Sequence, residues 1–163
     1  MTLDYNGKVV IVTGAGGGLG RCHALEFARR GAKVVVNDLG GAVDGSGGSS
    51  EAADKVVEEI KAAGGEAMSN GSSVTDDAGV ANMVQQTMDA YGRIDVLVNN
   101  AGVLRDKSFA KMEIADFDFV VDVHLFGTMK PTKAVWPIMK EQGYGRIMVC
   151  LLYTSDAADE GHC

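Results

Sequence analysis

The sequence contains few cysteines, few prolines and few aromatic side chains. Its three cysteines, Cys22, Cys150 and Cys163, include no Cys-x-x-Cys pair, and an odd number cannot all pair within one chain. This pattern excludes a disulfide-rich scaffold and gives no indication of a metal site, so we expect a reducing compartment and no bound metal. A single disulfide stays open from the spacing alone.

Long hydrophobic runs and excess positive charge are also missing. No apolar run approaches the ~18 residues of a transmembrane helix, and the first residues lack the charged-then-apolar pattern of a secretory leader. Lys and Arg number 15 against 22 Asp and Glu, which gives a net charge of −7. Because such a surface repels phosphate polymers, we expect neither a nucleic-acid partner nor a membrane. A soluble protein of the cytoplasm or an organelle matrix is the expectation.

Strand-like and helix-like segments alternate along the 163 residues, a length typical of one domain. Short runs rich in β-branched residues predict buried strands, at 9–12, 33–38, 66–68, 94–98 and 146–149. Apolar residues at helical spacing predict helices at 19–30, around 53–60 after a cap at Ser49 or Ser50, and from a cap at Thr75 or Asp76 to Tyr91. The alternation predicts an α/β fold with a doubly wound parallel sheet.

A long amphipathic segment follows the fourth predicted strand. Its apolar positions include Phe117, Leu125, Val135 and Met139. Pro131 and Pro137 fall inside it, and each removes a helical hydrogen-bond donor. We therefore expect a kink or a break at these prolines.

Glycine is plentiful, at 22 residues, and several glycines form a turn between the first strand and the first helix. The turn reads Thr13-Gly14-Ala15-Gly16-Gly17-Gly18-Leu19-Gly20, which fits T-G-x-x-x-G-x-G. Backbone N–H groups at the start of a helix, with the positive end of its dipole, attract a pyrophosphate. Asp38 ends the second strand, where a carboxylate accepts hydrogen bonds from an adenine ribose and repels a 2′-phosphate. The pair predicts a dinucleotide site that prefers NAD to NADP.

Together with Asn99-Asn100-Ala101-Gly102 after the fourth strand, this turn resembles the short-chain dehydrogenase/reductase family. The resemblance covers residues ~5–149 and implies a Rossmann-type domain. A narrower similarity, to the (3R)-hydroxyacyl-CoA dehydrogenase units of type 2 peroxisomal multifunctional enzymes and their bacterial relatives, rests on 37–41, 45–47, 99–109 and 123–127. It implies a bacterial cytoplasmic or peroxisomal location, an acyl-CoA substrate, NAD as cofactor and a homo-oligomer.

The resemblance also implies roles for individual residues. It places the cofactor against Thr13, Gly14, Gly18, Leu19, Gly20, Asp38, Leu39, Ser73, Val74, Asn100, Ala101 and Gly102. Ser73 stands where the family has Asp, a departure at the adenine contact. His124 stands where the wider family has an active-site Asn, which implies a catalytic role in arranging a lysine and a water; a partly buried helix histidine is the alternative.

The proton-transfer residues of the family are not found. Hydride transfer there requires a serine after the fifth strand and then a Tyr-x-x-x-Lys. Leu152 occupies the expected serine position, and Ala157 stands four residues after Tyr153. Residues 150–163 resemble a translated sequencing adapter. We therefore expect residues 1–149 to be the N-terminal part of the Rossmann domain, incomplete on its C-terminal side, and 150–163 to be a non-native tail.

Three functions follow from these observations. The first is part of an NAD-dependent dehydrogenase for (3R)-hydroxyacyl-CoA, inactive as this 163-residue chain. Another short-chain dehydrogenase, such as a 3-oxoacyl-carrier-protein reductase, is the second. The third, a non-catalytic dinucleotide-binding module, requires the C-terminal residues to be genuine.

Overall fold

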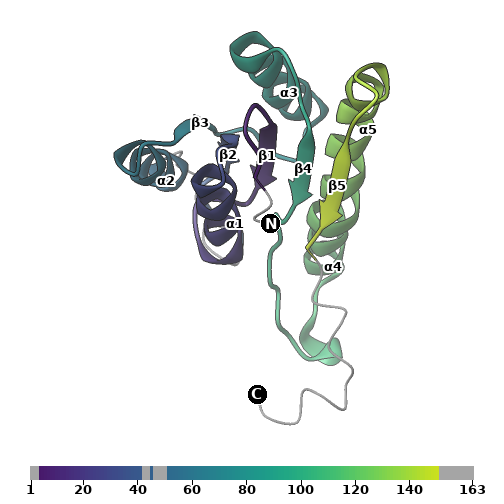
Figure 1. Ribbon diagram of the computed structural model, residues 1–163. Helices are drawn as coiled ribbons and strands as arrows, with labels where there is room; N and C mark the ends of the chain where they lie inside the picture. The colour runs from purple at the N-terminus through teal and green to yellow at the C-terminus, as the bar shows by residue number, and fades with distance from the viewer. Residues whose placement is uncertain (1–3, 42–44, 46–50, 151–163) are drawn as a thin grey trace, which may run out of the picture.

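The computed structural model describes residues 4–41, 45 and 51–150 (Figure 1). The strands are β1 (Val9–Thr13), β2 (Lys33–Asn37), β3 (Glu66–Asn70), β4 (Val96–Asn99) and β5 (Arg146–Val149). The helices are α1 (Gly18–Arg29), α2 (Glu51–Ala62), α3 (Asp77–Tyr91), η1 (Phe109–Lys111), α4 (Ile114–Val121), η2 (Asp122–Phe126) and α5 (Gly127–Glu141). All five predicted strands and the three predicted helices are therefore confirmed, with bounds that differ by a few residues.

The five strands form one parallel sheet in the order β3-β2-β1-β4-β5. The order reverses between β1 and β4, because the chain adds β2 and β3 on one side of β1 and returns to the other side. Val10 of β1 pairs with Val34 on one side and with Val96 on the other. This topology confirms the doubly wound α/β fold, and it places the loops after β1, β2, β3 and β4 at one edge, the carboxyl edge.

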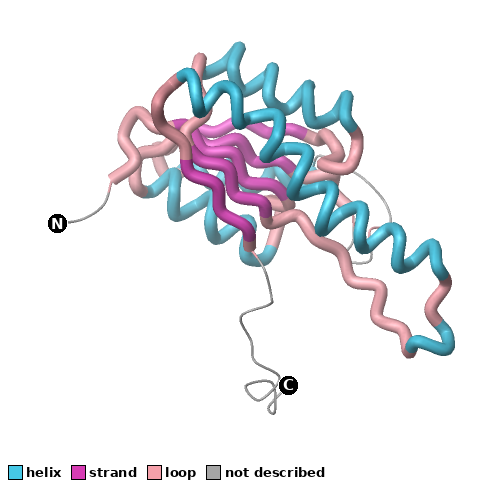
Figure 2. Tube along the Cα trace, turned by 90° about the vertical axis from the view of Figure 1, so that its right-hand side faces the viewer, coloured by secondary structure: helices cyan, strands magenta, loops and turns pink. Residues whose placement is uncertain are grey.

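Helices cover both faces of the sheet (Figure 2), and alternate side chains of the strands pack into two separate hydrophobic cores. Toward α1 and α2 the strands present a layer of valines, Val10, Val12, Val34, Val36, Val96 and Val98. Toward α3 and α5 they present Ile11, Val35 and Leu97, which pack with Met83 and Val135. Because both faces are covered, β1, β2 and β4 read as continuous apolar runs instead of alternating ones.

The segment after β4 runs away from the sheet to η1 and α4 (Figure 1). From α4 the chain returns through η2, a π-helical turn, into α5. Of the kink or break predicted at the prolines, the break is wrong, since α5 continues through both Pro131 and Pro137, and the kink stays a prediction. The irregular hydrogen bonding lies instead at η2, which ends directly before Gly127. Pro131 has no N–H, so it cannot donate the helical hydrogen bond to the Gly127 carbonyl.

Much of the amphipathic segment 117–139 is not covered by other elements. Val135 and Met139 pack into the core beside β4, whereas Phe117, Leu125 and Trp136 are exposed. β5 is an edge strand whose Met148 and Val149 are also exposed. Within the described residues, no helix has the length and apolar character needed to cross a membrane.

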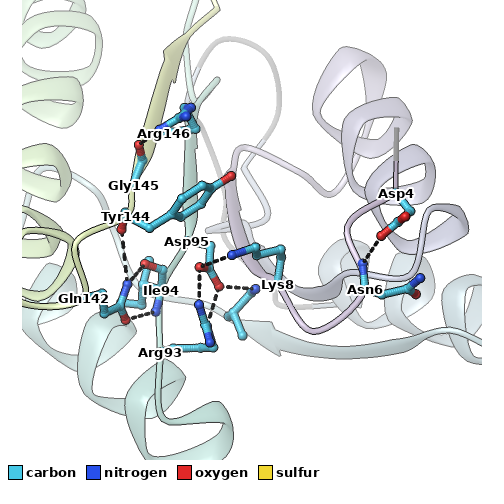
Figure 3. A network of polar contacts seen from close by, with 11 residues as sticks. Asp4, Asn6, Lys8, Arg93, Ile94, Asp95, Gln142, Tyr144, Gly145 and Arg146 are labelled. Atoms are coloured by element: carbon cyan, nitrogen blue, oxygen red, sulfur yellow. Dashed lines mark hydrogen bonds and ion pairs between the residues drawn. The ribbon is translucent and has the colours of Figure 1, made fainter. Parts of the chain in front are cut away.

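The amino ends of β1, β4 and β5 are joined around one buried carboxylate, that of Asp95 (Figure 3). Its oxygens accept hydrogen bonds from the Val9 N–H at 2.9 Å and from two guanidinium nitrogens of Arg93, both at 2.7 Å. Lys8 Nζ lies 3.3 Å from Asp95 Oδ1 and 3.9 Å from the ring centroid of Tyr144. These contacts fix the sheet at the edge opposite the glycine turn.

Candidate functional site

The glycine turn lies at the carboxyl edge, where residues 14–17 join β1 to α1. Gly14 has a φ of +62°, and a Cβ there would lie 2.7 Å from the Ala101 Cα. A Cβ on Gly20 would overlap with the Gly14 carbonyl oxygen and the Asn100 amide nitrogen. Two of the glycines are therefore required by close packing of the turn itself.

The first turn of α1 has no side-chain cap and no acidic residue. By contrast, α3 is capped by Asp76, whose Oδ2 accepts a hydrogen bond from the Gly79 N–H at 2.7 Å. The cap predicted at Thr75 or Asp76 is thus formed by Asp76, while Ser49 and Ser50 lie outside the described residues. The first N–H groups of α1 have no partner within the helix and carry the positive end of its dipole. This helix start fits an anion such as a diphosphate.

Asp38 lies directly beside the turn. Its Oδ2 accepts a hydrogen bond from the Gly16 N–H at 2.7 Å, and its Oδ1 accepts one from the Gly40 N–H, also at 2.7 Å. In the part of the chain that the structure describes, Asp38 makes no ion pair. Each carboxylate oxygen has two acceptor positions, so the group can keep both backbone hydrogen bonds and accept two more from a ligand.

Thr13 and Asn100 join the turn to the loop after β4. The Thr13 hydroxyl oxygen accepts hydrogen bonds from the N–H groups of Asn100 at 3.0 Å and Ala101 at 3.1 Å. The Asn100 side-chain amide donates to the carbonyl oxygens of Thr13 and Gly14, both at 2.9 Å. Thr13, Gly14, Asn100 and Ala101 are therefore together in space, and their contacts shape the backbone of the turn.

The loop after β3 brings Ser73 and Val74 to the same edge. Ser73 Oγ lies 2.9 Å from Thr75 Oγ1, which makes a short local turn. Val74 is buried, and a Cβ on Gly127 would lie 2.8 Å from the Val74 Cγ2. Val74 is thus held against the start of α5.

An amide network beneath this loop is a feature that the sequence analysis missed. Asn37 and Asn70 are buried at the ends of β2 and β3, and Asn37 Nδ2 donates to Asn70 Oδ1 at 2.8 Å and to the Ser72 carbonyl at 2.8 Å. Asn70 Nδ2 donates to Gln86 Oε1 of α3 at 2.8 Å. The detectable signal was an asparagine at the end of each strand, after the apolar run 34–36 in one case and after Ala67-Met68-Ser69 in the other.

His124 lies in η2 and contacts the loop after β4. Its Nε2 is 3.1 Å from the Val103 nitrogen and 2.9 Å from the Val103 carbonyl oxygen, and its Cε1 would lie 2.8 Å from a Cβ on Gly102. The imidazole is exposed and not a buried core histidine. The imidazole therefore contacts the backbone of Val103 and leaves no room for a side chain at position 102.

Two large apolar residues of the predicted set, Leu19 and Leu39, are 61% and 51% exposed. They flank Gly18 and Asp38, and both are available to cover a ligand at the carboxyl edge. Gly18 itself has a φ of +50° and open space where a Cβ would point. Leu152, the position expected for the family's serine, lies outside the described residues.

A glycine turn, an uncapped helix start and an acid ending the next strand meet where the strand order reverses. This arrangement defines a nucleotide-binding α/β protein of the doubly wound type. Residues 8–158 match the family described as short chain dehydrogenase. The chain belongs to the short-chain dehydrogenase family.

Known proteins of this family are similar over most of the chain. Peroxisomal multifunctional enzyme A of Dictyostelium discoideum is 57% identical over 158 residues, which are 97% of this chain and 34% of the relative. A short chain dehydrogenase from Mycobacterium avium has a crystal structure with 49% identity and a TM-score of 0.77, covering 88% of this chain and 51% of that one. A 7α-hydroxysteroid dehydrogenase complexed with NADH and 7-oxo glycochenodeoxycholic acid has 34% identity and a TM-score of 0.81, covering 90% and 53%.

This chain therefore spans about a third of the Dictyostelium relative and about half of each solved structure. The family resemblance is confirmed, and so is the narrower similarity to peroxisomal multifunctional enzymes.

Proposed function

We propose that this chain is the cofactor-binding part of an NAD-dependent dehydrogenase whose substrate is a (3R)-hydroxyacyl-CoA. The observation that carries the proposal is the Asp38 carboxylate, hydrogen-bonded to the Gly16 N–H at 2.7 Å and free of any ion pair among the described residues. The turn and the acid are adjacent, as one dinucleotide requires of its diphosphate and its ribose. The solved relative that contains NADH supports a nicotinamide dinucleotide.

Different residues of the carboxyl edge would contact different parts of the dinucleotide. The N–H groups at the start of α1, with Gly18, Leu19 and Gly20, would hold the diphosphate. Asp38 would accept hydrogen bonds from the ribose hydroxyls, with Leu39 beside it, and Ser73 and Val74 would border the adenine. Asn100, Ala101 and Gly102 would border the nicotinamide side. Bound NAD supplies the hydride acceptor for the substrate carbon.

We propose a positioning role for His124. The imidazole lies within hydrogen-bond distance of the Val103 backbone and so supports the loop 100–104 beside the cofactor site. Its ring is exposed and is accessible to a proton carrier. This role agrees with the one that the family resemblance implies, in which His124 helps to arrange a lysine and a water.

The proton-transfer step requires a Tyr-x-x-x-Lys that this sequence lacks. The residues four positions after its four tyrosines, Tyr5, Tyr91, Tyr144 and Tyr153, are Val9, Asp95, Met148 and Ala157. We therefore propose that the 163-residue chain binds NAD without turning over substrate. An acyl-CoA substrate, a homo-oligomer and a peroxisomal or bacterial cytoplasmic location are proposed for the parent protein. Residues 150–163 are proposed to be non-native, and genomic sequence after Val149 tests this.

Calorimetric titration of the purified chain with NAD tests the proposal. We expect saturable heat at one site per chain, and no NADH absorbance when a (3R)-hydroxyacyl-CoA is added. Absence of any heat from a chain that circular dichroism shows to be folded contradicts the binding proposal. Formation of NADH contradicts the proposed inactivity.

The 3-oxoacyl-carrier-protein reductase alternative makes a different prediction. If that alternative used NADPH, it would require NADP to bind at least as tightly as NAD. The unpaired charge of Asp38 opposes this, because it repels a 2′-phosphate.

A further inference from the structure

A cleft opens beside Asp38, on the side of the glycine turn that faces α2. It has a volume of about 340 Å³ and is lined by Gly16, Gly40 and residues of α1 and α2. Gly16 and Gly40 are the residues whose N–H groups hold the Asp38 carboxylate. A Cβ on Gly16 would lie 2.8 Å from the Ala52 Cβ and 2.9 Å from Asp38 Cγ, so the first turn of α2 lies against the acid.

The charged residues of this cleft come from two helices. Arg21 belongs to α1, while Glu51, Lys55 and Glu59 recur every four residues along one face of α2. The charges of Arg21 and Lys55 balance those of Glu51 and Glu59. With Asp38 included, the region therefore has one net negative charge. A second phosphate on the ribose would approach this set of charges as well as Asp38.

The pair between Arg21 and Glu59 has two hydrogen bonds and is less exposed than the other pair of the cleft. Arg21 Nε donates to Glu59 Oε1 at 3.1 Å, and Arg21 Nη2 donates to Glu59 Oε2, a bidentate arrangement that occupies one edge of the guanidinium. Lys55 and Glu51 form a single i,i+4 contact at 2.9 Å, and both side chains are about two-thirds exposed. A single exposed pair of this kind holds its charges weakly.

We propose that Glu59 is a specificity-determining residue: by pairing with Arg21, it withholds the guanidinium of this cleft from a ribose 2′-phosphate. This rests on the proposed function, because it concerns which dinucleotide the same site accepts. Arginine binds phosphate through the same fork of N–H groups that Glu59 occupies. The hydrogen bond from Arg21 lowers the pKa of Glu59 below its ordinary value, so the acid is ionised at neutral pH.

Glu59→Gln tests the proposal by removing the charge and keeping the shape. The matched control is Glu66→Gln, which breaks a similar surface pair with Lys33 at the opposite, amino edge of the sheet. Calorimetric titrations with NAD and with NADP give the ratio of the two dissociation constants for each protein. We expect E59Q to bind NADP about fivefold more tightly at low salt, with the NAD value changed by less than about twofold, and E66Q to match the parent.

Arg21→Met in the E59Q background identifies the cation responsible. The gain in NADP affinity should disappear in this double variant, and in E59Q it should shrink as salt is added. Thermal melting of each variant separates a role in joining α1 to α2 from a role in binding. A lower melting temperature for E59Q with an unchanged ratio of dissociation constants overturns the proposal and leaves a structural pair.

The two proposals fail differently in these titrations. If the folded parent does not bind NAD, the proposed function fails. If the parent binds NAD and E59Q behaves as E66Q does, or the gain persists without Arg21, only the role of Glu59 is refuted.

Discussion

The two edges of the sheet each hold an aspartate that accepts backbone hydrogen bonds, yet the two carboxylates have different surroundings. At the amino edge, Asp95 is buried and is met by Arg93, Lys8 and the Val9 N–H. At the carboxyl edge, Asp38 is met by two glycine N–H groups and by no cation among the described residues. The charge of Asp95 is paired with cations of the fold, and the charge of Asp38 is available to a ligand.

The glycine turn packs closely against the loop after β4. A Cβ on Gly14 or Gly20 would overlap with neighbouring atoms, whereas a Cβ on Gly17 or Gly18 would meet nothing within 4 Å. At the amino edge the contacts are made by long side chains, with Lys8 and Arg146 both lying over the Tyr144 ring (Figure 3). Side-chain pairing fixes one edge, while exposed backbone donors make the other edge suited to bind.

The largest expected effect comes from Asp95→Ala. Removing the carboxylate leaves the buried Val9 N–H without its acceptor and leaves Arg93 and Lys8 without their shared partner. We expect the free energy of unfolding to fall by roughly 3–4 kcal/mol. Urea denaturation measures it. Asp89→Asn, an exposed change on α3, is the control and should cost less than about 0.5 kcal/mol. Equal midpoints for both variants would show that Asp95 does not stabilise the sheet.

Gly20→Ala should have the next largest effect. Its Cβ would overlap with the Gly14 carbonyl and the Asn100 amide, so the turn must shift at a cost of roughly 1–3 kcal/mol. Gly17→Ala is the matched change, because a Cβ there meets nothing within 4 Å and the φ of −163° suits alanine. We expect G17A to keep the parent's stability and to weaken NAD binding. Thermal melting and calorimetry, run on both variants, separate the two effects.

The pH dependence of stability is the smallest of these effects. Burial by itself would raise the pKa of Asp95, but the hydrogen bonds from Arg93 and Val9, with the charges of Arg93 and Lys8, lower it overall. A lowered folded-state pKa means that this stability is present above the unfolded value of about 3.9 and is lost as the pH falls below it.

Urea denaturation from pH 6 to pH 2 measures this loss. The parent should lose stability more steeply than Asp95→Asn. Glu26, whose hydrogen bonds from Arg29 and Arg30 lower its pKa to about 2, contributes to the same range in both proteins. Parallel curves for parent and variant contradict the role of Asp95.

The strands and the glycine turn could be predicted because their signals are local. A β-branched run such as Val9–Val12 is typical of a strand covered on both faces, and the spacing from Gly14 to Gly20 predicts the turn that the structure contains. The family likewise followed from the short segments 13–20 and 99–102.

What the sequence could not provide was contact across the sheet. Asn37 and Asn70 meet only because β2 and β3 pair in that register, and Arg21 meets Glu59 only because α1 packs on α2. The prolines misled because one missing donor removes only one hydrogen bond from a helix, and α5 continues through Pro131 and Pro137 while its Val135 and Met139 pack in the core. Such tolerance depends on tertiary packing.

NAD titration of Asp38→Ala beside the parent tests the assignment of the carboxyl edge most directly. Losing hydrogen bonds from the ribose to a charged acceptor should weaken binding by about 10- to 100-fold. The melting temperature should change little, because the two hydrogen bonds of the Asp38 carboxylate come from the N–H groups of Gly16 and Gly40, which lie in loops, and its backbone hydrogen bond to Asn70 is kept in alanine. If D38A remains folded and binds NAD as tightly as the parent, the carboxyl edge is not the ribose site.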